Sequence, residues 1–328
     1  MTHKFALTRV LAAASIGLAA LAAPAAAEDV KSFPSKPVKM VVPFPAGGAT
    51  DAVARLVGQH LSTLWKQPVI IDNRPGAGTV IGTDAVARSP GDGYTLGMVI
   101  SAHTINPSLR SKLPYDTLTD FAPVSQIGMQ HLVIAANPKF EANNIAELVA
   151  LAKKNPGRIS YASPGSGTAM HLSMELLNVT AATQITHVPY KGGAPAQQDV
   201  IGGQVPLLLD VYHSAAPLIK AGRLKAIAML SPQRVAAAPE VPTIAETIPE
   251  VAAVGTIGIV APASTPKPLV AKMSADIASV VRSKEVSAKL AEMGIDPMGS
   301  TPEAYDQVIR AEIAKWAPVV KASGAKVD

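Results

Sequence analysis

Short apolar runs alternate along the chain with longer segments in which apolar residues recur at helical spacing. The short runs have the length and the β-branched content of buried strands, and the longer segments have the periodicity of amphipathic helices. We expect strands at 38–42, 69–71, 95–100, 132–135, 159–161, 185–188, 205–209, 226–229 and 258–260. We expect helices at 51–64, 82–88, 145–154, 169–178, 194–202, 215–221, 268–283, 283–293 and 302–323. This alternation is typical of parallel βαβ units and predicts an α/β fold of about two domains.

The first 27 residues have the pattern of a secretory signal peptide. Lys4 and Arg9 provide a basic start, residues 10–23 are uncharged and apolar, and three alanines ending at Ala27 form a small-residue cleavage site. The apolar run is about 14 residues long, shorter than the ~20 that a membrane-spanning helix needs. We therefore expect cleavage after Ala27 and export to the periplasm. A buried N-terminal helix is the alternative interpretation.

Composition excludes several kinds of site. The chain has no cysteine, which excludes disulfides, thiolate metal ligands and a cysteine nucleophile. Loss of Lys4 and Arg9 with the signal peptide lowers the formal charge from +5 to +3, and neither a basic cluster nor an aromatic-rich stretch indicates a nucleic-acid partner. No histidine pair has metal-ligand spacing, and the chain has neither a phosphate-binding loop nor a nucleophile-elbow motif. We expect no metal, no cofactor and no nucleic acid.

Three expected strands run directly into glycine-containing turns, each of which opens a helix. The turns are 43–51, 162–168 and 189–193. Ligands of open α/β sheets bind at the carboxyl ends of strands, where glycine lets the backbone approach and the next helix offers free amides to an anion. A simple helix cap explains each turn taken alone at least as well. The recurrence of the pattern favours a pair of turns that together hold a carboxylate.

Polar side chains in and near these turns each have two interpretations. Ser163, Ser166 and Thr168 add hydroxyl donors for an anion in the second turn. Asp51 would repel a carboxylate, so its better interpretation is that it orients loop amides or bound water. Asp210, at the end of an expected strand, fits a contact with a ligand's amino or hydroxyl group and a strand-end cap equally well.

Histidines next to expected strand ends are candidate donors to an anion. His103, His131 and His213 lie at such places, and His171 lies one turn into the helix after the second loop. Packing, capping or surface roles explain each of them equally well. A secreted enzyme with His171 or His103 as base is the main functional alternative, but no nucleophile or metal ligand stands at a recognisable spacing from either. Segment 76–82 has GxGxxxG spacing and is interpreted as a structural turn.

A series of short motifs, in order along essentially the whole chain after the signal peptide, resembles one protein family. The motifs are VPFPAGG at 42–48 with Asp51, NRPGAG at 73–78, DGYTL at 92–96, LPYD at 113–116, DFAPV at 120–124, YASPGSGT at 161–168 with His171, HVPYKG at 187–192, GGQV at 202–205 and PEVPT at 239–243. They are similar to those of the Bug-type extracytoplasmic solute receptors of tripartite tricarboxylate transporters. The ordered series is more specific than any single motif.

The resemblance implies a two-lobed periplasmic-binding-protein fold of type II, in which each lobe is a mainly parallel sheet flanked by helices. Lobe one would comprise residues 28–130 and 254–328, lobe two residues 131–253, and the hinge would be crossed twice. The implied function is capture of a small carboxylate, such as a dicarboxylic, aromatic or amino acid, for the membrane permease subunits of a tripartite transporter. We expect a monomer without enzymatic activity. A sensory receptor that docks on a signalling partner fits the same sequence.

The resemblance also implies a ligand cleft between the lobes, gripped by loops 46–51 and 163–168, partly through water. The expected ligand-binding residues are Phe44, Ala46, Gly47, Gly48, Asp51, Ser101, His103, His131, Ser163, Ser166, Gly167, Thr168, Tyr190 and Asp210. The choice among acids is expected to depend on residues 101–104, 130–131, 210–214 and 256–257.

Overall fold

The computed structural model describes residue 30 and residues 32–326. The expected signal peptide at 1–27 and its cleavage site therefore lie outside the described residues. The chain divides after Phe33, and all helices and strands of the described residues lie in the unit that begins at Pro34. Among the described residues, no helix combines the length and the apolar character needed to cross a membrane.

The expected alternation of strands and helices is present, and every expected element has a counterpart. The strands are β1 (Val38–Val42), β2 (Val69–Asn73), β3 (Thr95–Ile100), β4 (Phe121–Ala136), β5 (Ser160–Ser163), β6 (Thr186–Pro189), β7 (Leu207–Val211), β8 (Lys225–Met229), β9 (Val254–Pro262) and β10 (Ile295–Pro297). The helices are α2 (Ala49–Trp65), α3 (Val80–Ala87), α4 (Ala102–Leu109), α5 (Ile145–Lys154), α6 (Ala169–Ala181), α7 (Gly193–Ile201), α8 (Tyr212–Lys220), α9 (Lys267–Val281), α10 (Lys284–Glu292) and α11 (Pro302–Ser323). Short 3-10 turns lie at η1 (Ala77–Thr79), η2 (Ile244–Glu246) and η3 (Pro249–Val251).

Capping side chains set the starts of several helices. Asn144, Thr168, Ser283 and Thr301 each accept a hydrogen bond from a first-turn amide, in α5, α6, α10 and α11 respectively. Each cap satisfies one of the amides that the start of a helix leaves without an intrahelical partner. The longest of these helices, α11, ends at Gly324, whose φ of 67° is readily adopted by glycine.

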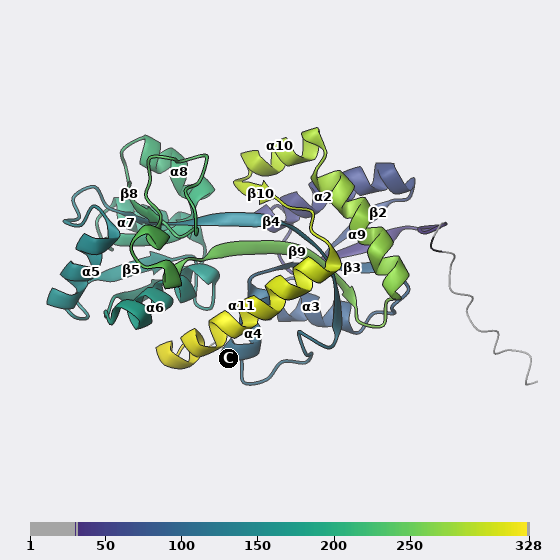
Figure 1. The fold of residues 1–328 in the computed structure, drawn as a ribbon, viewed down its shortest axis with the longest axis horizontal. Coiled ribbons are helices and arrows are strands. Elements are labelled where there is room, and N and C mark those ends of the chain that lie inside the picture. Colours follow the sequence, from purple (N-terminus) through teal and green to yellow (C-terminus); the bar gives the residue numbers. More distant parts are fainter. Residues whose placement is uncertain (1–29, 31, 327–328) are drawn as a thin grey trace, which may run out of the picture. The chain divides into compact units, whose positions relative to one another are not determined.

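The strands form one mixed sheet in the order β2-β1-β3-β9-β4-β7-β5-β6, with β8 and β10 each paired to β4. The outer pairs are parallel, namely β1 with β2 and β3, and β5 with β6 and β7. The central strands β4 and β9 are antiparallel to their neighbours. We call β1, β2, β3, β9 and β10 with the beginning of β4 the first sheet half, and β5 to β8 with the end of β4 the second sheet half (Figure 1).

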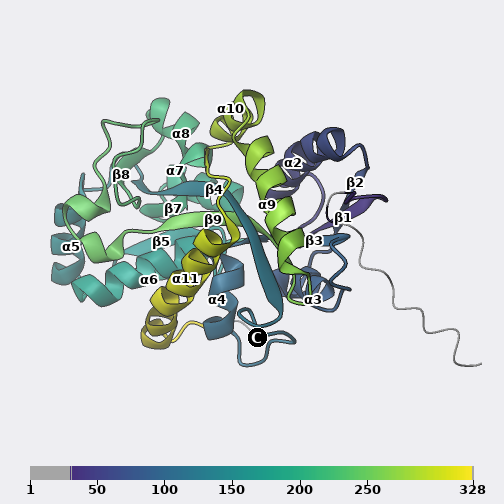
Figure 2. The ribbon, with the colours of Figure 1, turned by 45° about the vertical axis from the view of Figure 1, so that its right-hand side comes forward.

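Strand β4 belongs to both sheet halves. Its residues up to His131 pair with β9 and β10, and its residues from Leu132 onward pair with β7 and β8. Figures 1 and 2 show β4 and β9 side by side as they run between the two groups of strands. The change of partner falls beside the expected lobe boundary at 130/131. The other expected boundary, at 253/254, falls where β9 begins.

Helix α11 packs on both sheet halves. Tyr305 lies in an apolar cluster with Val260 of β9. Further along the helix, Trp316 lies in a second cluster with Leu172 of α6. The Trp316 ring is fully buried, and its Nε1 donates to the Glu312 carboxylate at 2.7 Å. The C-terminal helix, which the family resemblance assigns to lobe one, thus contributes a large buried side chain to the core of the second sheet half.

Candidate functional site

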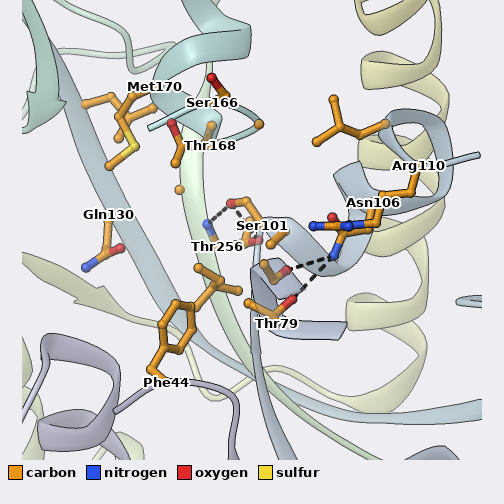
Figure 3. Close-up of a pocket in the computed structure, with 18 residues that line it drawn as sticks. Phe44, Thr79, Ser101, Asn106, Arg110, Gln130, Ser166, Thr168, Met170 and Thr256 are labelled. Atoms are coloured by element: carbon orange, nitrogen blue, oxygen red, sulfur yellow. Dashed lines mark hydrogen bonds between the residues drawn. The ribbon is translucent and has the colours of Figure 1, made fainter. Parts of the chain in front are cut away.

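A cavity of about 270 Å³ lies between the two sheet halves, where β3 and β5 end. Its lining is Phe44, Gly78, Thr79, Ile100, Ser101, Ala102, Asn106, Leu109, Arg110, Gln130, Leu132, Ser166, Gly167, Thr168, Ala169, Met170, Gly255 and Thr256. Figure 3 shows Ser101 and Thr256 in the middle of this set, with Arg110 and Asn106 on one side and Gln130 on the other. The lining includes one charged side chain, Arg110, and no carboxylate.

Two helices begin at the cavity, one from each sheet half. Ser101 and Ala102 lie at the start of α4, and Thr168 and Ala169 lie at the start of α6. The first amides of a helix have no intrahelical acceptor, and the aligned peptide dipoles add partial positive charge at this end. The cavity therefore presents amide donors from both sheet halves, an arrangement that favours an anion.

Hydrogen bonds within the second loop fix the start of α6. The Thr168 hydroxyl donates to the Gly165 carbonyl at 2.8 Å and accepts from the His171 amide at 3.2 Å. The Gly167 amide donates to Nδ1 of His171 at 3.0 Å. Gly165 and Gly167 have φ angles of 154° and 76°, which glycine adopts without a steric penalty. The loop therefore reaches the cavity in a defined shape.

A stacked histidine pair supports this loop. The rings of His171 and His187 are 4.0 Å apart and nearly parallel, and Nε2 of His187 lies 2.7 Å from Oγ of Ser163. Burial lowers the pKa of His171 to about 4. Burial and the neighbouring His171 lower the pKa of His187 to about 3. Both rings are therefore neutral at pH 7, as Nδ1 of His171 must be to accept the Gly167 amide.

Four residues of the second loop were expected to bind the ligand, and three of them line the cavity. Ser166, Gly167 and Thr168 line the cavity. Ser163 is fully buried and lies outside the lining, with its hydroxyl against His187. The Ser163 and His187 side chains are close enough for a nucleophile and its base, but the hydroxyl has no exposure to the cavity.

The first loop contributes less to the cavity than the second. Phe44 lines it, whereas Ala46, Gly47 and Gly48 are exposed and lie outside the lining. The expected pair of gripping loops is therefore unequal in this arrangement.

Asp51 fixes the first loop from within. Its carboxylate accepts the Gly47 amide at 2.8 Å, Nε of Arg55 at 2.8 Å and Nδ2 of Asn73 at 2.9 Å. The hydrogen bond from Arg55 is the largest of the effects that lower the pKa of Asp51 to about 2. The buried carboxylate is therefore charged at pH 7 and holds a loop amide, the orienting role that the sequence favoured for it.

Ser101 joins the start of α4 to β9. Its Oγ accepts the Thr256 amide at 2.9 Å and lies 3.3 Å from Oγ1 of Thr256. Both residues are buried and line the cavity, so this contact forms part of its floor (Figure 3). Thr256 and Gln130 belong to segments 256–257 and 130–131, which were expected to influence the choice among acids.

His103 lies among aromatic side chains and outside the cavity lining. It is 2% exposed, its ring is 5.0 Å from that of Phe121 in an edge-to-face contact, and it is 6.5 Å from the ring of Tyr115. Neither of its ring nitrogens has a hydrogen-bond partner, and burial lowers its pKa to about 4. His103 is therefore placed as a neutral packing residue.

The remaining expected residues also lie outside the lining. Nε2 of His131 is 2.6 Å from the Asp296 carboxylate. The Tyr190 hydroxyl donates to the Asp199 carboxylate at 2.6 Å. Asp210 is buried, which raises its pKa, and it accepts from its neighbours' amide groups as a strand-end cap would. No cluster of three His, Asp or Glu side chains able to hold a metal occurs in the part of the chain that the structure describes.

Comparison with known proteins identifies the family. The family model described as "Tripartite tricarboxylate transporter family receptor" matches residues 53–325. Protein BugT of Bordetella pertussis strain Tohama I is 37% identical over 326 residues, which cover 98% of this chain and 99% of BugT. The chain belongs to the tripartite tricarboxylate transporter receptor family. The predicted Bug-type resemblance is confirmed, and the protein is a solute-binding receptor.

Solved structures of similar proteins confirm the predicted α/β periplasmic-binding-protein fold class. The expectation of a mainly parallel sheet in each lobe is wrong, because β4 and β9 run antiparallel to their neighbours and make both sheet halves mixed. An R. palustris protein solved with adipate is 33% identical, with a TM-score of 0.78 over 90% of this chain and 100% of that one. MatC from Rhodopseudomonas palustris, solved with bound malate, is 31% identical, with a TM-score of 0.74 over 88% of this chain and 100% of that one.

The receptor's cavity also includes part of segment 76–82, which was interpreted from its sequence as a structural turn. Residues Gly76, Ala77, Gly78 and Thr79 have φ angles of 131°, 46°, 59° and 83°. Positive φ at a non-glycine residue is strained and is found preferentially at ligand sites. Gly78 and Thr79 line the cavity. The closely spaced glycines of this segment are a sequence signal for an unusual turn. Nothing in the sequence indicates that this turn lies against α4.

Asn106 holds this turn against α4. Its Nδ2 donates to the Gly78 carbonyl at 3.1 Å and to Oγ1 of Thr79 at 3.3 Å. Asn106 and Arg110 both line the receptor's cavity, and neither was expected to do so. They lie in and just after α4, a helix that the sequence pattern did not predict.

Proposed function

We propose that this receptor captures a small carboxylate in the cavity between the two sheet halves. The observation that carries the proposal is the charge pattern of the site. Two helix starts and one arginine face a cavity whose lining has no carboxylate side chain. This pattern attracts an anion and leaves a cation without a charged partner.

The size of the cavity favours a small acid. At about 270 Å³ it lies just below the range of roughly 300–1,000 Å³ typical of small-molecule sites. This size suits a short organic acid. The adipate and malate in the two similar structures belong to the same chemical class, which supports the proposal.

We further propose that the two sheet halves act as lobes that close on the ligand. In the open form, the exposed first loop around Gly47 would stand away from the ligand, and closure would add it to the contacts that the second loop makes. Such closure is a population shift driven by contacts with both lobes at once. The closed monomer would then deliver the acid to the permease subunits of a tripartite transporter, in the periplasm and after removal of residues 1–27. We assign it no catalytic step.

A thermal-shift panel tests the carboxylate proposal. The purified chain lacking residues 1–27 is heated with dicarboxylic, aromatic and amino acids, and separately with sugars and divalent cations. A ligand at about 100 times its Kd adds ~2.7 kcal/mol of stability, which raises the melting temperature by several degrees. We expect this rise with at least one acid. A rise with sugars or cations alone would refute carboxylate capture.

A further inference from the structure

Arg110 is the one charged side chain of the cavity lining. Nε of Arg110 is buried and has no hydrogen-bond partner, and no carboxylate among the described residues forms an ion pair with this side chain. A guanidinium carries donors in a rigid fork that matches a carboxylate, and a buried donor without an acceptor is costly. The Arg110 guanidinium is therefore positioned to donate hydrogen bonds to an acceptor that the described chain does not supply, such as a ligand carboxylate.

Other arginines show that this situation is unusual within the molecule. Five of them pair with carboxylates of the chain, namely Arg55, Arg74, Arg88, Arg234 and Arg310. Arg158 and Arg223 have no such partner in the described chain, but both are exposed and reach water. Arg110 combines a missing partner with a buried donor, and it lines the ligand cavity.

The surroundings of Arg110 are built to accommodate its head group. A Cβ atom on Gly78 would lie 2.7 Å from Nη2 of Arg110, so glycine leaves the space that the guanidinium occupies. Gly78 sits in the turn that Asn106 holds through two hydrogen bonds. The turn, the asparagine and the arginine therefore form one polar wall of the cavity (Figure 3).

The polar wall is distinct from the start of α6. Figure 3 shows Ser166 and Thr168 from the α6 loop apart from Arg110 and Asn106. Apolar side chains complete the lining, among them Leu109, Leu132 and Met170. A ligand that meets both polar regions needs an anionic group at each end and a short apolar segment between them.

We propose that Arg110 binds a second anionic group of the ligand and thereby selects linear dicarboxylates over monocarboxylates of the same length. The inference rests on the proposed carboxylate function and adds a specificity-determining residue to it. One carboxylate lies at the start of α6, and the other accepts hydrogen bonds from the Arg110 fork. Asn106 holds the turn beside it and needs no charge of its own.

The test uses matched ligands and isothermal titration calorimetry on the chain without residues 1–27. The probes are succinate, glutarate and adipate, each compared with its own monoamide, which has the same length and one charge fewer. We expect the wild type to prefer at least one dicarboxylate over its monoamide by at least tenfold. Arg110→Gln should reduce that preference to about threefold or less, because charge-assisted hydrogen bonds change affinity by roughly tenfold to a hundredfold. Arg110→Lys should lie between the two, since it keeps the charge and loses the fork.

Two controls separate recognition from folding. Arg158→Gln removes an exposed arginine outside the cavity and should leave both affinities unchanged. Arg110→Gln without ligand should melt no lower than the wild type, because it removes an unpaired buried donor. A clearly lower melting temperature would assign Arg110 to the fold and overturn the inference.

The outcomes distinguish this inference from the proposed function. If no carboxylate of the wider panel binds the wild type, the carboxylate function itself fails, before any variant is made. If acids bind but no dicarboxylate exceeds its monoamide, the function stands and the role of Arg110 is refuted. Equal dicarboxylate affinity in the wild type and in Arg110→Gln would also refute it.

Discussion

The two glycine loops of this receptor have similar sequence patterns and different internal chemistry. Each follows a parallel strand and opens a helix, α2 for the first loop and α6 for the second. In the first loop, the Asp51 carboxylate accepts the Gly47 amide and forms an ion pair with Arg55. In the second, the neutral ring of His171 accepts the Gly167 amide, and no acidic side chain lies in the cavity lining.

This difference shows why the two loops are unequal as anion sites. The second loop is satisfied by uncharged groups, so the partial positive charge of the α6 start is not offset beside the cavity. The first loop is held by the Asp51–Arg55 ion pair, and its glycines lie outside the cavity lining. The second loop therefore offers its helix start to the cavity, and the first loop does not.

The largest expected effect follows from placing a negative charge at each loop in turn. Ser166→Asp introduces a carboxylate into the lining at the second loop, whereas Ala46→Asp introduces one into the exposed first loop outside the lining. A like charge next to a bound anion costs several kcal/mol, so Ser166→Asp should weaken the tightest acid of the panel by about 100-fold. Ala46→Asp should weaken it by less than about tenfold. Both positions are exposed, but Ala46 lies outside the lining, so water between its charge and the bound anion screens the repulsion. Calorimetry measures both.

The reverse order of these two effects would overturn the comparison. It would mean that the first loop makes the main contact with the anion, so that the ligand-bound arrangement differs from the cavity described above. Melting temperatures of both variants without ligand serve as the control for folding.

A smaller effect is expected from pH, and it should come from the second loop. The pKa of His171 is lowered from 6.5 to about 4 in the folded chain, so the unfolded chain binds more protons between these values. Stability is therefore fully present above pH 6.5 and is lost as the pH falls through this window. At ~1.36 kcal/mol per pKa unit, the His171 contribution falls by about 2 kcal/mol between pH 7 and pH 5. The first loop should not respond, because Asp51 stays charged in this range.

Urea unfolding at pH 7 and pH 5 measures this dependence, with His171→Gln as the comparison. Gln does not titrate, so the variant should lose about 2 kcal/mol less than the wild type over the same interval. His103 also has a lowered pKa and stays in both proteins, so its contribution cancels in the difference. The lowered pKa of His187 depends partly on His171, so the difference reports the stacked pair and should be at least this large. Identical losses in the two proteins would show that His171 does not carry the effect.

Regular elements were predictable from the sequence because their signal is local. The predicted ranges 38–42, 95–100, 145–154 and 302–323 coincide with β1, β3, α5 and α11. Strand β4 was predicted only at 132–135, since its first part contains Pro123 and Gly128 and shifts register beside both. Helix α4 was missed because it is only eight residues long and carries Pro107 in its interior.

The candidate site was predictable only where it coincides with a local pattern. The glycine loop at Ser166, Gly167 and Thr168 was found, because a strand followed by glycine and a helix is visible in the sequence. Asn106 and Arg110 were missed, because their role depends on the missed helix and on a turn distant in the sequence. A histidine beside a strand end gave no reliable signal, since both packing and binding place histidine there.

The smallest effect tests whether the cap of α6 is also part of the site. Thr168→Ala removes a hydroxyl that accepts the His171 amide, and Thr301→Ala removes the equivalent cap of α11. Each should cost ~1 kcal/mol of stability, the usual value of an N-cap threonine. Only Thr168 lines the cavity, and its hydroxyl fixes the second loop by donating to the Gly165 carbonyl. Only its variant should therefore also weaken acid binding, by up to about tenfold, as the loop loses its fixed shape. Urea unfolding and calorimetry on the same samples separate the two quantities. If both variants bind the acid as the wild type does, Thr168 is a cap and no more, and the advantage of the second loop over the first must come from its backbone amides alone.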